Sequence, residues 1–155
     1  YTPTTFTNSQ FPHITSYGHE LALSVVFESA LQHMADRPEG YENLPGAARD
    51  FLRDLPAAWD DIRFLSGYPG KDVNLARRKG ADWFVGGINS EFRAKSVTVD
   101  FSFLAEGQDY KLTLISDGKH DKAFDVYHQV VKNTDSLEVR MLPRGGYVIS
   151  LKPLF

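Results

Sequence analysis

From Trp59 to the end of the chain, the sequence consists of short segments in which apolar and polar residues alternate. Gly, Asp and Asn separate these segments about every eight to twelve residues, and no helical pattern lies between them. Parallel strands need crossover helices, so this arrangement predicts an antiparallel β-sandwich of about eight strands. The predicted strands are Ile62–Leu65, Val73–Arg78, Trp83–Asn89, Ser96–Phe101, Tyr110–Ser116, Phe124–Lys132, Leu137–Leu142 and Tyr147–Leu151.

The first third of the chain has helical patterns instead. Residues His19–Met34 contain neither Pro nor Gly, and their apolar side chains cover most of a helical circumference. This predicts a helix that packs on several sides. Asp36–Tyr41 should turn, and Leu44–Leu55 should form an amphipathic helix that Pro56 ends. The fold class is therefore α+β, with N-terminal helices followed by the sandwich.

Charge and cysteine content exclude several classes of partner and site. The 155 residues carry 17 basic and 20 acidic side chains, a formal net charge of -3, without a basic run that could follow a phosphate backbone. The chain has no Cys, which excludes disulfides and thiolate zinc sites. No apolar run reaches the roughly 18 to 20 residues of a membrane span. We therefore expect neither nucleic acid nor a membrane as partner.

Two pairs of adjacent polar residues are candidate sites. His19 and Glu20 open the first helix, where the His could orient a substrate group, although a structural histidine is the commoner case. Asp60 and Asp61 follow Trp59 and could suggest an acid and base pair beside a sugar-stacking ring. Adjacent strand residues point to opposite faces, so we expect a turn before the first strand instead.

Two loops resemble ligand motifs only superficially. Residues Asp117–Asp121 hint at a calcium loop but lack the spacing of an EF-hand, which favours a solvated hairpin turn. Residues Gly67–Lys71 lack the Ser or Thr of a phosphate loop and also indicate a turn.

Aromatic residues could either stack on sugars or fill the core. Along the strand at Trp83, we expect Trp83 and Val85 on one face and Phe84 on the other. The aromatic candidates are Trp59, Tyr68, Trp83, Phe84, Phe92, Tyr110, Tyr127 and Tyr147.

Several strings together resemble the C-terminal region of glycoside hydrolase family 97. They are HELALSVVFESALQHMADRPEGY at residues 19–41, PAAWDDIRFLSGYPGK at 56–71, LARRKGADWFVGGIN at 75–89, DFSFLAEGQDYKLTLISDGK at 100–119 and LPRGGYVISL at 142–151. By this resemblance, residues 1–56 are the last strand end and last helix of a (β/α)₈ barrel with a connecting helix, and residues 57–155 are a C-terminal β-sandwich domain.

The resemblance implies an α-glucosidase or α-galactosidase with calcium at its active site, and suggests a periplasmic or secreted protein. The family's catalytic and calcium-binding residues precede this stretch. We therefore expect no catalytic, cofactor-binding or metal-binding residue in this chain. Only residues 1–10 should approach the active site of the complete enzyme.

Two functions of different kinds fit these observations. The chain is either the non-catalytic end of a glycosidase, bracing its upstream barrel and supporting oligomer contacts, or an independent carbohydrate-binding module. A helix that is apolar on most sides favours the first. It also predicts a homo-oligomer with Val25, Val26, Phe27 or Leu31 at the contact.

Overall fold

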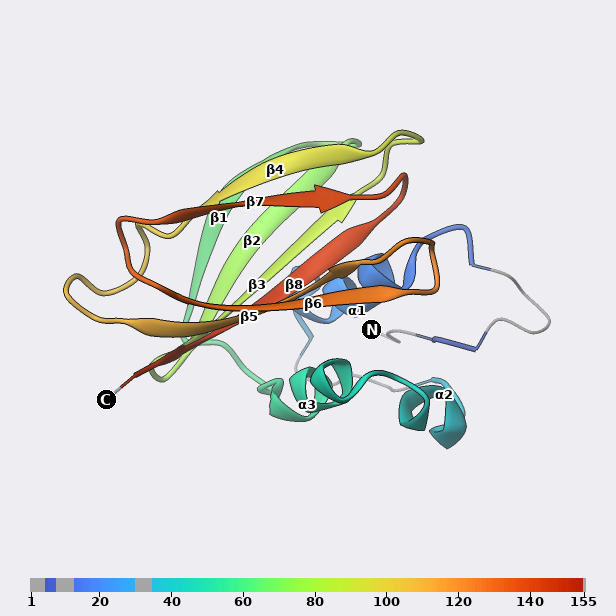
Figure 1. Cartoon of the computed structure of the whole chain (residues 1–155), viewed down its shortest axis with the longest axis horizontal. Helices are drawn as coiled ribbons and strands as arrows, with labels where there is room; N and C mark the ends of the chain where they lie inside the picture. The colour runs from blue at the N-terminus through green and yellow to red at the C-terminus, as the bar shows by residue number, and fades with distance from the viewer. Residues whose placement is uncertain (1–4, 8–12, 30–34, 155) are drawn as a thin grey trace.

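The computed structural model describes residues 5–7, 13–29 and 35–154, and it confirms an antiparallel β-sandwich preceded by short helices (Figure 1). A six-stranded sheet has the order β1-β2-β3-β8-β5-β6, and β4 pairs with β7 in a second sheet. The elements are α1 (Tyr17–Val26), α2 (Pro38–Glu42), α3 (Gly46–Asp54), β1 (Asp61–Tyr68), β2 (Asp72–Lys79), β3 (Asp82–Asn89), β4 (Lys95–Asp100), β5 (Tyr110–Asp117), β6 (Phe124–Val131), β7 (Ser136–Met141) and β8 (Gly146–Pro153). Each predicted strand is present.

The two-stranded sheet shows the alternation that the sequence predicted. Val97 and Val99 of β4 are buried, as are Val139 and Met141 of β7. The residues between them are mostly exposed polar side chains, so this sheet is apolar on its inner face and polar toward solvent.

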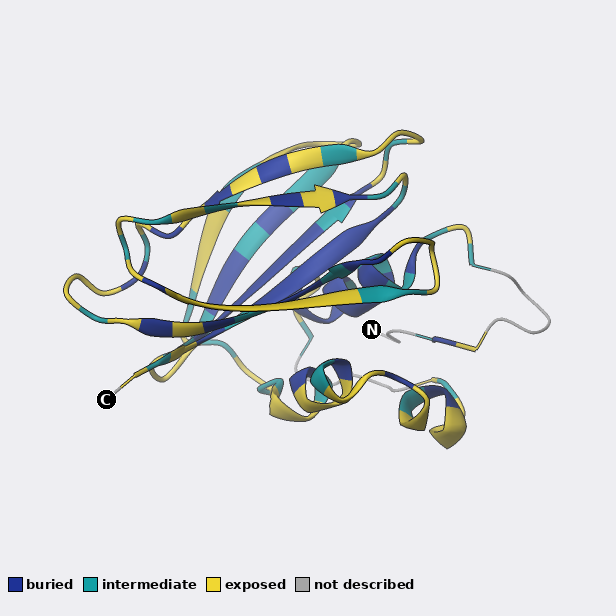
Figure 2. Ribbon diagram, viewed as in Figure 1, coloured by how far each residue is buried: buried dark blue, intermediate teal, exposed yellow. Residues whose placement is uncertain are grey.

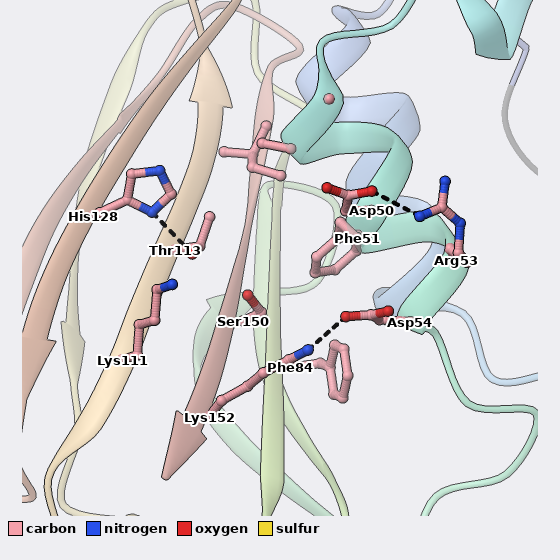
Figure 3. A pocket seen from close by; sticks show the side chains of 13 residues that line it. Asp50, Phe51, Arg53, Asp54, Phe84, Lys111, Thr113, His128, Ser150 and Lys152 are labelled. Carbon is pink, nitrogen blue, oxygen red and sulfur yellow. Dashed lines mark hydrogen bonds and ion pairs between the residues drawn. The ribbon is translucent and has the colours of Figure 1, made fainter. Parts of the chain in front are cut away.

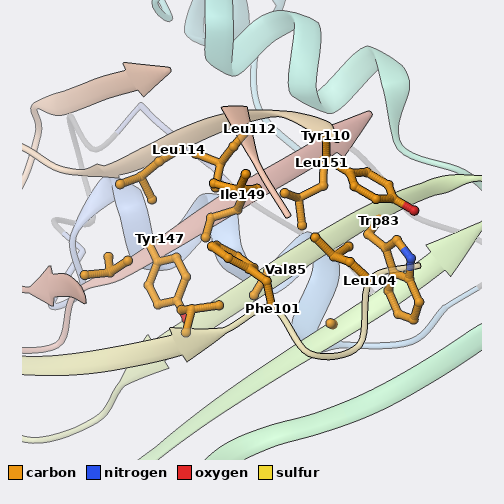
Figure 4. Packing of buried hydrophobic residues seen from close by; sticks show 14 of the residues in the cluster. Trp83, Val85, Phe101, Leu104, Tyr110, Leu112, Leu114, Tyr147, Ile149 and Leu151 are labelled. Carbon is orange, nitrogen blue, oxygen red and sulfur yellow. The ribbon is translucent and has the colours of Figure 1, made fainter. Parts of the chain in front are cut away.

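The main core lies between the two sheets (Figure 4). Trp83 and Val85 face this core, whereas Phe84 belongs to a second core on the opposite face of the large sheet. The predicted division of these three residues between two faces is therefore confirmed. Strand β8 is central in the large sheet and contributes to both cores, with Ile149 on one side and Val148 on the other.

The second core lies beneath α1, on what we call the helix side of the large sheet. Leu21 and Val25 of α1 are fully buried and share this core with Phe84 and Val148. Gly86 of β3 allows the close approach, because a Cβ there would lie 2.8 Å from the Cβ of Val25. None of the ten residues of α1 is exposed, which confirms a helix packed on several sides.

The helix boundaries differ from the predicted ones. α1 begins at Tyr17 with Ser16 as its N-cap, and it ends at Val26 with Phe27 in an extended conformation. The prediction of a helix as far as Met34 was therefore wrong, and residues 30–34 lie outside the described part of the chain. The predicted turn before Tyr41 contains the short helix α2, and α3 lies inside the predicted Leu44–Leu55.

Candidate functional site

A buried arginine holds the end of α1. The side chain of Arg77 in β2 is 4% exposed, and its Nε donates to the carbonyl of Val25 at 2.7 Å. Its two terminal nitrogens reach the carbonyl of Val26 at 3.4 Å and the carboxylate of Glu28 at 3.2 Å. The last carbonyls of a helix have no partner within the helix, so Arg77 stabilises this end. Sequence reasoning missed Arg77, because Leu75 two positions earlier on the same strand face is apolar whereas Lys79 two positions later is charged.

A buried carboxylate joins the start of α1 to two distant loops. Asp117 at the end of β5 accepts the backbone N–H of Leu142 at 2.8 Å and of Gly146 at 2.9 Å. It also accepts the hydroxyl of Ser16, whose Oγ in turn accepts the N–H of His19 at 3.0 Å. Desolvation raises the pKa of the Asp117 carboxyl despite these donors. The expectation of a solvated turn is correct for the exposed Lys119 but not for Asp117, whose role sequence reasoning missed.

His19 and Glu20 have structural partners. The ring Nδ1 of His19 lies 3.2 Å from the carbonyl of Gly145, and burial lowers the pKa of this imidazole. Glu20 accepts the hydroxyl of Thr15 at 2.6 Å and lies 3.5 Å from the ring of His13. These contacts join the start of α1 to its surroundings, so the structural interpretation of His19 holds.

Asp60 and Asp61 lie where the chain enters β1, and each contacts a different partner. Asp60 accepts the N–H of Gly80 at 2.7 Å and pairs with Lys79 at 2.9 Å. Asp61 begins β1 and forms an exposed salt bridge with Arg63 at 2.8 Å. The two carboxylates therefore have separate partners and do not form an acid and base pair. Residues Gly67–Lys71 likewise form the end of β1 and its turn into β2.

The aromatic candidates divide between the cores and separate surface positions. Trp83, Phe84, Tyr110 and Tyr147 are buried, and Trp59 is partly buried against Phe84. Tyr68, Phe92 and Tyr127 are exposed, on β1, on the loop after β3 and on β6 respectively.

A polar groove lies between α3 and strands β5, β6 and β8 (Figure 3). Its volume is about 640 Å³, and Phe51 and Phe84 contribute apolar surface to its lining. Asp54 pairs with Lys152 at 2.6 Å, and Asp50 pairs with Arg53 at 2.9 Å. Each carboxylate of the groove thus already faces a cation, an arrangement suited to polar contacts rather than to acid and base catalysis.

Within the described residues, no group of three or more His, Asp or Glu side chains comes together as a metal site would require. Nor is any helix in that part of the chain long and apolar enough to cross a membrane.

Two surfaces of the described residues carry exposed apolar side chains. The first, the helix-side patch, consists of Val26, Phe27, Ile62 and Phe64, of which the last three are 46%, 46% and 66% exposed. Its two parts lie on the same side of the sheet, because Ile62 pairs in register with Arg77, which binds the carbonyls at the end of α1.

The second surface is strand β6, where six consecutive residues are exposed (Figure 2). Val25 belongs to neither surface, because it is fully buried within its own chain, so its expected place at an oligomer contact was wrong. Leu31 lies outside the described residues.

Comparison with known proteins gives the same relationship from sequence and from structure. The chain is 37% identical over 147 residues to a probable retaining alpha-galactosidase of Streptomyces bingchenggensis, covering 95% of this chain and 22% of that protein. It is 34% identical over 137 residues to the retaining alpha-galactosidase of Bacteroides thetaiotaomicron, covering 86% of this chain and 20% of that protein. The chain therefore spans about a fifth of the length of these relatives.

A solved family 97 enzyme from Pseudoalteromonas sp. strain K8, an R171K variant, superimposes with a TM-score of 0.85 at 28% identity. The match covers 91% of this chain and 23% of that one. Residues 58–152 match the family model described as the glycosyl-hydrolase 97 C-terminal region, oligomerisation. The chain thus belongs to glycoside hydrolase family 97, as part of its C-terminal oligomerisation region.

Proposed function

We propose that this chain is the non-catalytic C-terminal portion of a glycosidase that acts on α-galactosides, that it braces an upstream catalytic barrel and that it supports oligomer contacts. Both curated relatives named above are alpha-galactosidases, about four fifths of whose length lies outside the match. In this proposal, residues 1–56 end the barrel and residues 57–155 form the appended sandwich. The expected approach of residues 1–10 to the active site falls largely outside the described residues.

The observation that supports bracing is the helix-side patch. Leu21 and Val25 on the inner side of α1 pack on the chain's own sheet, whereas Val26 and Phe27 lie at its end, which Arg77 links to the strand pair that carries Ile62 and Phe64. Large exposed apolar patches on soluble proteins mark contact sites. The upstream barrel is the occupant that we propose for this patch.

The calcium ion implied by the resemblance would lie outside this chain. The described residues bring together no group of three or more His, Asp or Glu side chains that could hold it. In this proposal, the calcium ligands and the reacting groups belong to the upstream barrel.

The alternative, an independent carbohydrate-binding module, would need an aromatic platform. The exposed rings of Tyr68, Phe92 and Tyr127 belong to different elements. Lys71 lies over the ring of Tyr68 and Arg144 over that of Phe92, so two of these rings already face cations. No observation favours this second function over the first.

Two assays test the proposal. The purified chain should hydrolyse neither nitrophenyl α-galactoside nor nitrophenyl α-glucoside, and turnover that disappears on mutating one of its carboxylates would contradict the non-catalytic role.

In the complete protein, Phe64→Lys should lower the melting temperature of the catalytic portion because it places a charge in the contact. Thr98→Lys, on the polar face of β4, is the control. Equal melting temperatures for the two variants would contradict bracing through this patch.

A further inference from the structure

We propose that strand β6 is the contact through which two copies of this chain associate, pairing antiparallel with the β6 of the second copy. This inference rests on the oligomer-supporting role of the family's C-terminal region, and it assigns that role to particular residues. Strand β6 lies within residues 58–152, the segment that matches the oligomerisation region.

Strand β6 is an edge strand without the usual protection against pairing. It pairs only with β5 among the described strands, over eight consecutive residue pairs without a register shift. An edge strand offers unpaired N–H and C=O groups, which proteins normally block with Pro, Lys, a bulge or a short strand. Residues Phe124–Val131 contain no Pro, no Lys and no bulge, and their one acidic residue, Asp125, lies next to the start of the strand.

The opposite edge of the same sheet is protected. Strand β1 has a register shift between Phe64 and Ser66, and Gly67 has a positive φ of 146°. The exposed pair Asp61 and Arg63 adds charge to this edge. A second strand therefore meets an irregular edge at β1 and a regular one at β6.

The side chains of β6 suit a copy of the same strand. Val126 and Val130 are 40% and 52% exposed, and their partners in β5, Ile115 and Lys111, place both on the helix side. In a two-fold antiparallel pair, residues of like parity can face each other, so Val126 of one copy can lie near Val130 of the other.

The charges near the ends of β6 are also complementary to an antiparallel copy. Asp125 follows the start of the strand and Lys132 follows its end, and both are exposed. Antiparallel alignment brings the acidic end of each copy toward the basic end of the other. Opposite charges at such positions steer association and fix register.

The geometry also leaves room for the catalytic portions. The two-fold axis that relates two antiparallel edge strands in a continuous sheet is perpendicular to that sheet, so both helix sides face the same way. Since α1 and the helix-side patch lie on that side, the patch remains available to the barrel while β6 contacts the second copy.

Because the chain has no Cys, single cysteines can locate the axis. In a two-fold dimer, only a residue beside the axis lies close to the same residue of the second copy. On mild oxidation, a disulfide-linked dimer should therefore form readily for one of the single-cysteine variants, and weakly or not at all for its neighbours in the strand. The variants are Val126→Cys, Tyr127→Cys, His128→Cys, Gln129→Cys and Val130→Cys. Linkage at none of the five, with the oxidised chain still associated, would overturn the proposal.

A second experiment measures association directly by sedimentation velocity over a range of concentrations. The double variant Val126→Lys/Val130→Lys should raise the dimer dissociation constant on the order of 100-fold, because it places like charges in the contact. The matched controls are Phe64→Lys on the helix-side patch and Thr98→Lys on the polar face, with circular dichroism confirming the fold of each variant. Both controls should associate as the unmodified chain does.

The outcomes separate this inference from the proposed function. If the unmodified chain associates and only Phe64→Lys dissociates it, the β6 contact is wrong while the oligomer-supporting role stands. If the unmodified chain remains monomeric at every concentration, the oligomer-supporting role of this chain fails as well, and the β6 contact with it.

Discussion

The Nε of Arg77 in β2 donates a hydrogen bond of 2.7 Å to the carbonyl of Val25, in the last turn of α1. Fifty-two positions separate the two residues in the sequence. The partner that satisfies the end of this helix therefore comes from a strand in the sandwich. Helix α1 and the hairpin of β2 and β3 are consequently coupled in stability.

Removing this partner should destabilise the chain. Arg77→Met keeps much of the apolar volume but leaves the carbonyls of Val25 and Val26 without their donor, at a cost of about 2 to 4 kcal/mol in the free energy of unfolding. Urea denaturation followed by circular dichroism measures it. Arg63→Met, which loses only an exposed salt bridge, should cost less than about 1 kcal/mol. Equal midpoints and slopes for the two variants would show that Arg77 does not stabilise this end.

Gly86 should be required for the packing of α1. In Gly86→Ala the new Cβ would crowd the side chain of Val25, which should destabilise the fold by about 1 to 3 kcal/mol. Val25→Gly in the same chain removes both the Cβ and the Cγ1 that the new methyl group would meet, so the double variant should be more stable than the sum of the single effects predicts. Gly46→Ala, where no atom lies within 4 Å of the added Cβ, is the control and should change stability by less than about 1 kcal/mol. Strict additivity would contradict this close packing.

Asp117 should give the fold a distinct dependence on pH. Burial raises its pKa above the ordinary value of 3.8, so the folded chain binds this proton more tightly than the unfolded chain does. The resulting stabilisation is complete below the unfolded pKa and is lost as the pH rises through the folded pKa.

Asp117→Asn cannot titrate, so the stability of the original chain relative to this variant should decrease as the pH rises from about 4 toward neutrality. Chemical denaturation at a series of pH values measures the difference, to which His19 also contributes because the charge of Asp117 acts on the pKa of its imidazole. An Asp117→Asn difference that does not vary with pH would contradict the raised pKa.

The strands could be predicted because alternation within each segment follows directly from one face being buried, as for Val97 and Val99. The predicted first helix was longer than α1, because the apolar pattern of the sequence continues past Val26. In the structure the helix ends at Val26, where Arg77 donates a hydrogen bond to the carbonyl of Val25. The short helix α2 was missed because Pro38 was interpreted as a turn signal, although Pro is also favoured at the first position of a helix.

Asp117 shows what the sequence did not reveal about the candidate site. Its neighbours Gly118 and Lys119 are typical of a turn, and the donors that hold the carboxylate come from Ser16, Leu142 and Gly146, remote in sequence. A single sequence gives no information on such contacts, because they depend on how the strands are ordered. The division into six and two strands could not be predicted for the same reason.

The core beneath α1 also determines which piece of this protein can be transplanted. Phe84, Ile115 and Val148 on the sheet are covered by side chains that precede residue 57, including Leu21 and Val25. A graft beginning at the first strand would expose these apolar residues to water and to neighbouring molecules. The segment that recombination or fusion could transfer intact therefore begins upstream of Tyr17, with helix and sheet inherited together.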